Sequence, residues 1–235
     1  MAQANVEEAQ SLGRSLSMCM ALGEAACPIA IMTGDFPAAE NYLAALMEAA
    51  SRQGLSFWIG MGRCLEGKLL IRRGEVKRGT ALLQDAIGAY RIAQQSLHYS
   101  GFVADLAEGL AMDGRAGEGT AIIEEALTRS NSSGVRWHAA ELMRVGAGLR
   151  LAGARDPQLL EQAMLLRSAL DVARDQGALF WELRAALSLA QVEARRGDGE
   201  KAERLLKGIF DRVTGSFETP DVQAIKRMLA GISTK

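Results

Sequence analysis

Apolar residues recur along this chain with a helical spacing, and the same pattern is repeated several times. In each repeat a turn glycine is followed by a small residue and then by two pairs of larger residues. One repeat opens at Trp58 and contains Gly74, Gly79, Leu82–Leu83 and Ala86–Ile87. Residues three and four apart share one face of a helix, so this pattern predicts a helix with one apolar face.

The turn glycines set the period of the repeat, which is 39 to 44 residues. They are Gly34, Gly74, Gly114, Gly153 and Gly197. A large side chain stands 15 or 16 residues before each of them, and the repeat register predicts that the tryptophans among these are core residues. They could alternatively form a stacking ladder for bases. The longest interval contains an insertion, 154–157, which displaces the next helix by four residues. A fixed period of this length is typical of helical units that bury their apolar faces by stacking.

The chain is therefore predicted to be all-α, a tetratricopeptide-like α–α superhelix of about five helical hairpins. We expect one helical-repeat domain over residues 1–235. The predicted units are residues 13–54, 55–96, 97–134, 135–177 and 178–214, followed by a C-terminal capping helix over 219–232.

Helix boundaries are predicted from capping residues. The first pair is a helix over Ser15–Thr33, kinked near Cys27–Pro28, and a helix over Pro37–Arg52 whose N-cap is Asp35. A carboxylate at the N-cap accepts a backbone N–H, and proline near the first turn loses no hydrogen bond. A proline within a helix removes one.

Later boundaries follow the same logic. Asp156 followed by Pro157 is predicted to start the second helix of the fourth unit, and Thr219 is predicted to cap the last helix. The stretch Asn131–Gly134 is predicted to be a loop. The segment Ala4–Leu12 resembles the tail of a helix that has no partner before it. We therefore expect the chain to be a C-terminal fragment of a larger protein.

Composition and charge narrow the function classes. The net charge is −1 and no basic block occurs, which argues against direct nucleic-acid binding. The longest apolar run, Ala25–Met32, is short for a membrane span, so we expect a cytoplasmic protein with no membrane contact. Cys19, Cys27 and Cys64 lack metal-ligand spacing and are expected to be buried and reduced.

Candidate catalytic motifs are weak. The string Gly62–Leu69 approaches a phosphate-binding loop, but Leu69 replaces the hydroxyl residue and the context is helical. Its glycines are better explained by close helix packing. His98 and His138 have no partner arrangement typical of a catalytic triad, and we expect each to be a packing or surface residue. The prediction is a protein without catalytic, cofactor or metal sites.

Polar residues on the first helices of the repeats are the candidate binding residues, because first helices of such arrays line the concave side. They are Glu24, Arg63, Glu66, Asp105, Glu108, Glu141, Arg144 and Arg184. Alternating charges could hold a peptide or a charged metabolite by paired hydrogen bonds. The alternative is that they form solvated faces or salt bridges between repeats, which contribute little.

Particular strings in the chain resemble the C-terminal helical-repeat region of large bacterial signalling ATPases. These strings are 16–35, 62–67, 70–75, 106–110, 176–186 and 217–222. Such proteins carry a winged-helix DNA-binding domain or a class III adenylate or guanylate cyclase domain at the N-terminus, followed by an ATPase domain. The resemblance covers essentially the whole chain. The repeat also resembles tetratricopeptide arrays in its architecture, although its period is longer than that family's 34 residues and the family's motif is not intact.

This resemblance implies a signal-transduction role as the sensor or interaction arm of a bacterial transcriptional regulator or cyclase. The partner would be a protein, a peptide or a small-molecule effector, and N-terminal effector domains would be attached covalently. Any ATPase or cyclase activity would lie in segments absent from this chain. Two other functions stay open at this point: a general scaffold that docks a peptide or helix in its groove, and an enzyme with a groove site.

Overall fold

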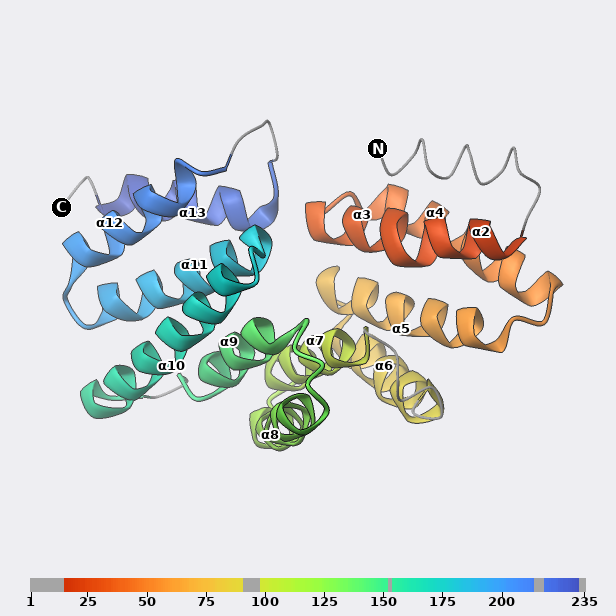
Figure 1. Cartoon of the computed structure of the whole chain (residues 1–235), viewed down its shortest axis with the longest axis horizontal. Coiled ribbons are helices and arrows are strands. Elements are labelled where there is room, and N and C mark those ends of the chain that lie inside the picture. Colours follow the sequence, from red (N-terminus) through yellow and green to blue (C-terminus); the bar gives the residue numbers. More distant parts are fainter. Residues whose placement is uncertain (1–14, 91–97, 152–153, 214–217, 233–235) are drawn as a thin grey trace. The chain divides into compact units, whose positions relative to one another are not determined.

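The computed structural model describes residues 15–90, 98–151, 154–213 and 218–232. Over these residues the chain forms helices and no strand, which confirms the all-α prediction. The chain divides into two compact units, Met1–Asp113 (unit 1) and Gly114–Lys235 (unit 2), coloured from red to yellow-green and from green to blue in Figure 1. The unit boundary coincides with the turn predicted at Gly114.

Unit 1 is a succession of helices joined by short turns. Its elements are α2 (Ser15–Met20), η1 (Ala21–Ala26), α3 (Cys27–Thr33), α4 (Phe36–Arg52), α5 (Ser56–Arg72), α6 (Val76–Tyr90) and α7 (Tyr99–Met112). The side chain of Asp35 accepts a hydrogen bond from the backbone N–H of Ala38 at 3.1 Å, which confirms the predicted N-cap of α4. Four of the predicted turn glycines have positive φ, from 77° at Gly34 to 89° at Gly74.

The first helix, α2–η1–α3, spans the predicted range and contains a wider π-helical segment. The N–H of Cys27 bonds the carbonyl of Leu22, five residues earlier. Pro28 follows directly and has no N–H to donate, so the regular bond pattern must change near it. The irregularity predicted at Cys27–Pro28 therefore takes the form of a π turn on the N-terminal side of the proline.

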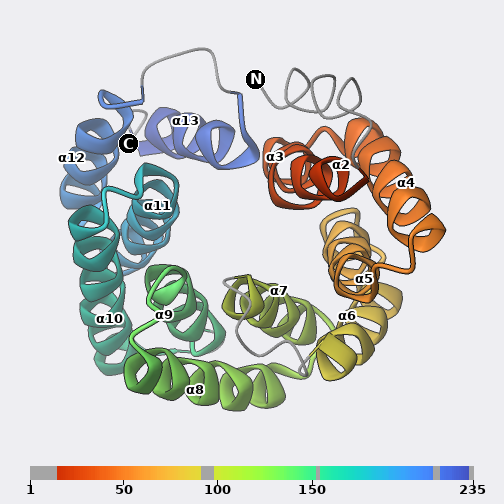
Figure 2. The same ribbon diagram turned by 45° about the vertical axis from the view of Figure 1, so that its right-hand side comes forward.

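Helix α5 is the centre of unit 1, with α4 and α6 packed against it (Figure 2). It also contacts η1, α3 and α7. Its buried residues accordingly point in all directions and include Trp58, Met61, Leu65 and Leu70. A helix that is apolar on every side is one enclosed by its neighbours.

Two glycines let α5 and α6 approach each other closely. A methyl group at Gly67 would lie 2.8 Å from Cβ of Leu83, and one at Gly79 would lie 2.7 Å from the backbone nitrogen of Ile71. Both distances are far below van der Waals contact. The predicted packing role of Gly67 and of the small residue at position 79 is therefore confirmed.

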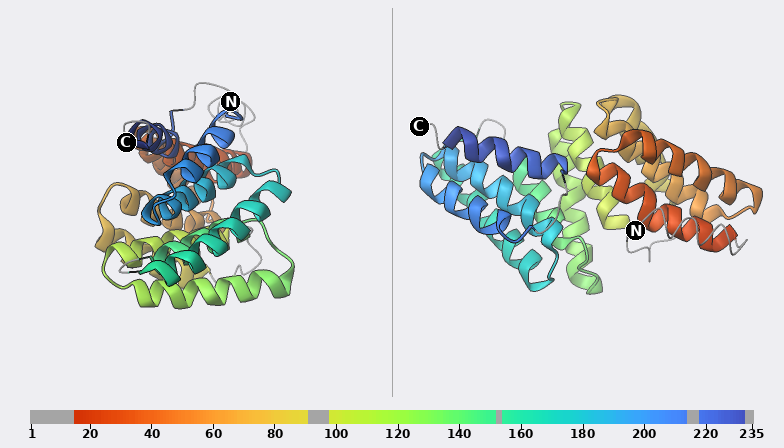
Figure 3. Two further views of the ribbon diagram at one scale, coloured as in Figure 1. Left: turned by 90° about the vertical axis from the view of Figure 1, so that its left-hand side faces the viewer. Right: turned by 90° about the horizontal axis from the view of Figure 1, so that it is seen from above.

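Unit 2 continues the alternation of helices and turns. Its elements are α8 (Ala116–Ser133), α9 (Ala139–Leu149), α10 (Asp156–Asp175), α11 (Leu179–Arg195), α12 (Gly199–Phe210) and α13 (Pro220–Ile232). Helix α11 packs against α9, α10 and α12. Helix α13, dark blue in Figure 3, packs against α12 and α11, and Thr219 caps it by accepting the N–H of Val222 at 3.2 Å.

The predicted loop at Asn131–Gly134 is wrong, because α8 continues through Ser133 and ends at Gly134 with a φ of 72°. Serine hydroxyls at the helix end satisfy local carbonyl groups. Ser130 donates to the carbonyl of Val135 at 2.8 Å and Ser132 to that of Arg129 at 3.0 Å. These bonds stabilise the end of the helix, although its polar sequence is typical of a loop.

The predicted cap of α10 is displaced by one residue. Arg155 has extended backbone angles and is the N-cap, so Asp156 and Pro157 are the first two helical residues. The N–H of Arg155 donates to Oε1 of Gln158 at 3.1 Å. This reciprocal bond fixes the boundary, while the charge of Asp156 still favours the helix N-terminus.

The tryptophans do not all lie in the core. Trp58 is 6% exposed, as predicted, whereas Trp137 is 65% exposed. Helix α9 begins at Ala139, so Trp137 precedes the helix and misses its buried face. Trp181 is half-buried, and its ring lies edge-on to those of Phe180 and His138, with centroids 4.9 and 5.6 Å away. His138 thus has the packing role expected of it.

Two predictions lie outside the described residues: the helical tail over 4–12 and the turn at residue 153. One described helix, Ser15–Thr33, is long and apolar enough by length and composition to cross a membrane. The whole helix is therefore a candidate membrane span by these two criteria, although the apolar run Ala25–Met32 alone is too short. In unit 1 this helix packs against α4 and α5, and Cys19, Leu22 and Ile31 are buried there.

Candidate functional site

The candidate binding residues divide between the two units. Unit 1 contains Glu24 on η1, Arg63 and Glu66 on α5, and Asp105 and Glu108 on α7. Unit 2 contains the other three, Glu141, Arg144 and Arg184. They therefore form separate sets, and we consider each unit in turn.

In unit 1, Asp105 and Glu108 pair with cations of α5. Asp105 is 7% exposed and lies 2.8 Å from Nζ of Lys68 and 3.3 Å from Nη2 of Arg72. Arg72 also reaches Glu108 at 3.0 Å. Lys68 and Arg72 were not among the predicted residues, although they lie four residues apart on one face of α5 and the two acids lie three residues apart on one face of α7. These bonds connect α5 to α7, as the structural alternative expected.

His98 lies near this ion-pair network, at the start of α7. Burial lowers the pKa of His98; the nearby Glu24 opposes that shift and Lys68 adds to it. Glu24 itself is exposed on η1. Glu24 and Lys68 therefore lie within electrostatic range of His98, and its partial burial favours the neutral imidazole.

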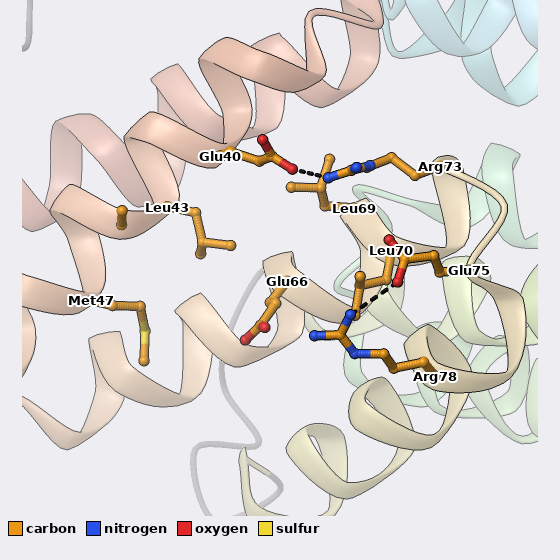
Figure 4. Close-up of a pocket in the computed structure, with 10 residues that line it drawn as sticks. Glu40, Leu43, Met47, Glu66, Leu69, Leu70, Arg73, Glu75 and Arg78 are labelled. Atoms are coloured by element: carbon orange, nitrogen blue, oxygen red, sulfur yellow. Dashed lines mark hydrogen bonds and ion pairs between the residues drawn. The ribbon is translucent and has the colours of Figure 1, made fainter.

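Glu66 faces a different surface, a hollow formed by α4, α5 and the start of α6 (Figure 4). The hollow has a volume of about 400 Å³ and is open to solvent. It is lined by Glu40, Leu43, Ala44, Met47, Glu66, Leu69, Leu70, Arg73, Glu75 and Arg78. Glu66 and Arg63 were predicted to share a concave groove with the α7 acids, but Glu66 lines this hollow, whereas Lys68 and Arg72 of the same helix pair with α7.

Two ion pairs form the rim of this hollow. Glu40 of α4 pairs with Arg73, which follows α5, and Glu75 pairs with Arg78 of α6 at 2.9 Å. Both pairs are drawn in Figure 4. The carboxylate of Glu66 points into the hollow in that view, and no ion pair or side-chain hydrogen bond connects it to any other residue that the structure describes.

In unit 2 the candidate residues form one buried network. Arg144 donates two hydrogen bonds to Glu141, each 2.8 Å long, in a bidentate arrangement. Arg184 of α11 also donates to Glu141 of α9, and its Nε lies 3.6 Å from Asp221 of α13. Glu141 is 4% exposed. The network therefore joins three helices of unit 2, and it includes Asp221, which was not among the candidate residues.

Two further buried carboxylates on α11 were missed. Glu182 and Glu193 are each 1% exposed. Glu182 pairs with Arg174 and Arg212, and Glu193 pairs with Arg167, Arg196 and Lys201. These contacts connect α11 to α10 and to the neighbourhood of α12. Their eleven-residue separation, three helical turns, is the only sequence signal that could have suggested them.

The cysteines are free thiols in the core of unit 1. Burial raises the pKa of Cys27 to about 12, with Lys68 acting in the opposite direction, and burial raises the pKa of Cys64 to about 12, with Arg63 opposing. A thiol that resists ionisation is a poor nucleophile and a poor metal ligand. Across the described ranges, no group of three or more His, Cys, Asp or Glu is placed to hold a metal ion.

The glycine-rich string Gly62–Leu69 lies wholly within α5. Gly67 faces Leu83, and a methyl group at Gly62 would overlap the thioether of Met47. Phosphate binding requires free backbone N–H groups at a helix N-terminus, and this segment offers none. Glu66 lines the hollow and forms no ion pair with another residue that the structure describes. The chain matches no protein-family model and no curated protein.

Proposed function

We propose that this chain is a non-catalytic binding module that docks a segment of a protein partner in the hollow between α4, α5 and α6. In this proposal the helices stack as a tetratricopeptide-like superhelix. The observation that carries the proposal is the hollow itself, which has an apolar floor of Leu43, Met47 and Leu70 and a charged rim. Its volume of about 400 Å³ lies within the range of ligand-binding pockets.

The openness of the hollow favours a peptide over a small metabolite. A small-molecule site encloses most of its ligand, and it would present unpaired Arg and Glu groups that converge. Here Arg73 and Arg78 are already paired with carboxylates at the rim. An open, partly apolar surface suits side chains of a longer segment that continues beyond it.

The resemblance to the repeat region of bacterial signalling ATPases supplies the biological setting of the proposal. The module would be the interaction arm of a cytoplasmic signalling or transcription regulator. Partner binding would act on attached effector domains only as far as the partner prefers one of their states. The module needs no cofactor for this role.

The test uses a substitution that fills the hollow. Ala44 lines it and is exposed, so Ala44→Trp places a large ring there without entering the core. Ala81→Trp is the matched control, because Ala81 is an exposed residue of α6 that does not line the hollow. Peptides are selected on the wild-type chain from a displayed random library, and their affinities for both variants are measured by fluorescence polarisation.

We expect selected peptides to lose at least tenfold in affinity for Ala44→Trp and to keep their affinity for Ala81→Trp. Selected peptides that bind both variants equally would show that the hollow is not the docking surface. A small-molecule effector is the second candidate. A metabolite at about 100 times its dissociation constant would raise the free energy of unfolding by about 2.7 kcal/mol, which a thermal-unfolding panel detects.

A further inference from the structure

We infer that the hollow takes a lysine or arginine side chain of the partner segment, with the cation at Glu66 and the aliphatic stem over Leu43, Met47 and Leu70. This inference rests on the proposed function and specifies its ligand chemistry. Three observations lead to it: the charge balance of the lining, the position of the Glu66 carboxylate and the apolar side chains of the floor.

The lining of the hollow carries an excess negative charge. Three carboxylates and two guanidinium groups line it. The pairs Glu40–Arg73 and Glu75–Arg78 account for two of the carboxylates and for both cations. Glu66 is left without a cationic partner in the described part of the chain. A half-buried carboxylate in this state favours a ligand that brings a positive charge.

The position of Glu66 determines where in the hollow a cation would bind. Figure 4 shows its carboxylate inside the hollow, in view between Met47 and the guanidinium of Arg78. Arg73, Glu75 and Arg78 of the rim pairs lie at or near the turn between α5 and α6, whereas Glu66 stands two turns before Arg73 on α5. The carboxylate is therefore set back from this turn and shares the hollow with the apolar side chains of Leu43 and Met47 (Figure 4).

The floor suits the stem of a long cationic side chain. Leu43, Met47, Leu69 and Leu70 supply methyl and thioether surface next to the carboxylate. Lysine and arginine pack their methylene groups on such surfaces while the charged end seeks a polar partner. A methionine also adapts its shape to the incoming chain. A compact cation without a stem would leave this surface uncovered.

The experiment uses methyl NMR of the whole chain, with labelled methionine and leucine methyl groups, and small defined probes. Nα-acetyl-lysine amide is titrated against Nα-acetyl-norleucine amide, which has a similar stem and no charge. We expect saturable shifts of the Met47 and Leu70 methyl groups with the lysine probe. We expect binding at least tenfold weaker for the norleucine probe and for lysine with Glu66→Gln, because a charge-assisted hydrogen bond is lost.

The control is Glu48→Gln, which neutralises an exposed carboxylate of α4 that pairs with Arg52 and does not line the hollow. It should bind the lysine probe as the wild type does. The inference is overturned if both probes bind equally, if Glu66→Gln binds lysine normally, or if no methyl group of the hollow shifts. The methyl spectra of each variant also report whether it is folded.

A further probe separates a partner side chain from a free amine. Pentylamine carries a single ammonium group on an alkyl chain, as the lysine probe does, but has no peptide backbone. Tighter binding of pentylamine than of the lysine amide would identify a free amine as the occupant and overturn the inference. If selected peptides are blocked by Ala44→Trp yet bind Glu66→Gln as well as wild type, the docking function stands and only the cation assignment fails.

Discussion

Nε of Arg174 donates a hydrogen bond to Oε1 of Glu182 at 2.9 Å, and this contact joins α10 to α11. Arg212 donates to the same oxygen at 2.5 Å. The two sides of the contact differ in their surroundings. Glu182 is 1% exposed, whereas both arginine side chains are about half exposed, at 46% and 55%. The acid depends on its partners, while each arginine can return to water.

This asymmetry predicts unequal effects of mutation. Replacing both Arg174 and Arg212 by alanine leaves the buried carboxylate unpaired and should lower the free energy of unfolding by about 3 kcal/mol. Glu182→Gln keeps the shape and releases two solvated cations, so it should cost only about 1 kcal/mol. Urea denaturation, followed by spectroscopic signals from unit 2, measures both changes in the free energy of unfolding. Equal losses for the double variant and Glu182→Gln would contradict the argument.

The close approach of α5 and α6 makes a second prediction. Gly67→Ala and Gly79→Ala each introduce a methyl group within 2.8 Å of the neighbouring helix, and for Gly79 the nearest atoms are backbone. Helices cannot part locally without opening the core, so each substitution should destabilise the chain by about 2 kcal/mol. Thermal unfolding followed by circular dichroism measures the loss.

Gly88→Ala is the control for these substitutions. Gly88 lies in the same helix, α6, and a methyl group there meets no atom of the described residues within 4 Å. Alanine has the higher helix propensity, so Gly88→Ala should raise the free energy of unfolding by about 0.5 to 1 kcal/mol. A loss of stability at Gly88 equal to that at Gly67 would show that the close contact is not the cause.

The buried thiols predict a loss of stability at alkaline pH. In the unfolded chain a cysteine ionises near its ordinary pKa of 9.0, whereas burial raises the pKa of Cys27 and of Cys64 to about 12 in the folded chain. Between these values the unfolded state binds fewer protons, so stability is complete below pH 9 and falls as the pH rises toward 12. The slope should approach about 1.4 kcal/mol per pH unit for each thiol.

Alanine substitution separates the thiols from other alkaline titrations. Denaturant midpoints between about pH 8 and 10.5 should fall less steeply for Cys64→Ala than for the wild type. Wild-type thiols should also react slowly with a disulfide reagent at about pH 8 until denaturant is added. Parallel midpoint curves for the wild type and Cys64→Ala would contradict the assigned pKa.

Gln162 of α10 supplies a fourth prediction. It is 2% exposed, and no described group donates to its Oε1. Replacing a buried acceptor that has no donor by an apolar residue of similar size removes a desolvation penalty. Gln162→Leu should therefore leave the free energy of unfolding unchanged or raise it by about 1 kcal/mol.

Gln158 of the same helix is the comparison for Gln162. Its Oε1 accepts the N–H of Arg155 at 3.1 Å, so Gln158→Leu should cost about 1 kcal/mol by removing a cap contact. Both variants are compared by urea denaturation. A loss above about 1 kcal/mol for Gln162→Leu would indicate that the buried amide is held by its surroundings.

Features that depend on neighbours in the chain could be predicted from the sequence. Asp35 and Thr219 cap helices because the side-chain oxygen of each accepts the backbone N–H of the residue three positions later. The described turn glycines take positive φ because the chain reverses direction there. The packing of Gly79 was likewise predicted, since the repeat places a small residue five positions after the turn glycine. The all-α class follows from the same local rules.

Features that depend on how helices meet could not be predicted. The pairing of Lys68 with Asp105 depends on how α5 is aligned along α7. The spacing of residues in the sequence shows only which face of a helix they share. Glu66 was grouped with Arg63, but its surroundings depend on the spacing of α4 and α6 across α5. The repeat register predicted Trp137 in the core, but α9 begins two residues later, at Ala139, so Trp137 precedes the helix and is exposed.

The π turn of the first helix adjusts the phase of its two halves. Cys19 and Cys27 are eight residues apart, which overshoots two α-helical turns, yet both are 0% exposed. A turn closed five residues apart takes up roughly one residue more than an α turn, so the segment Ala21–Ala26 absorbs the surplus. Both thiols are then kept on the buried side of the helix. If the same eight residues formed a regular α-helix, Cys19 would turn by roughly 80° relative to Cys27 and away from the buried side. The segment is therefore a one-residue phase correction that lets a helix interrupted by Pro28 present a single buried edge.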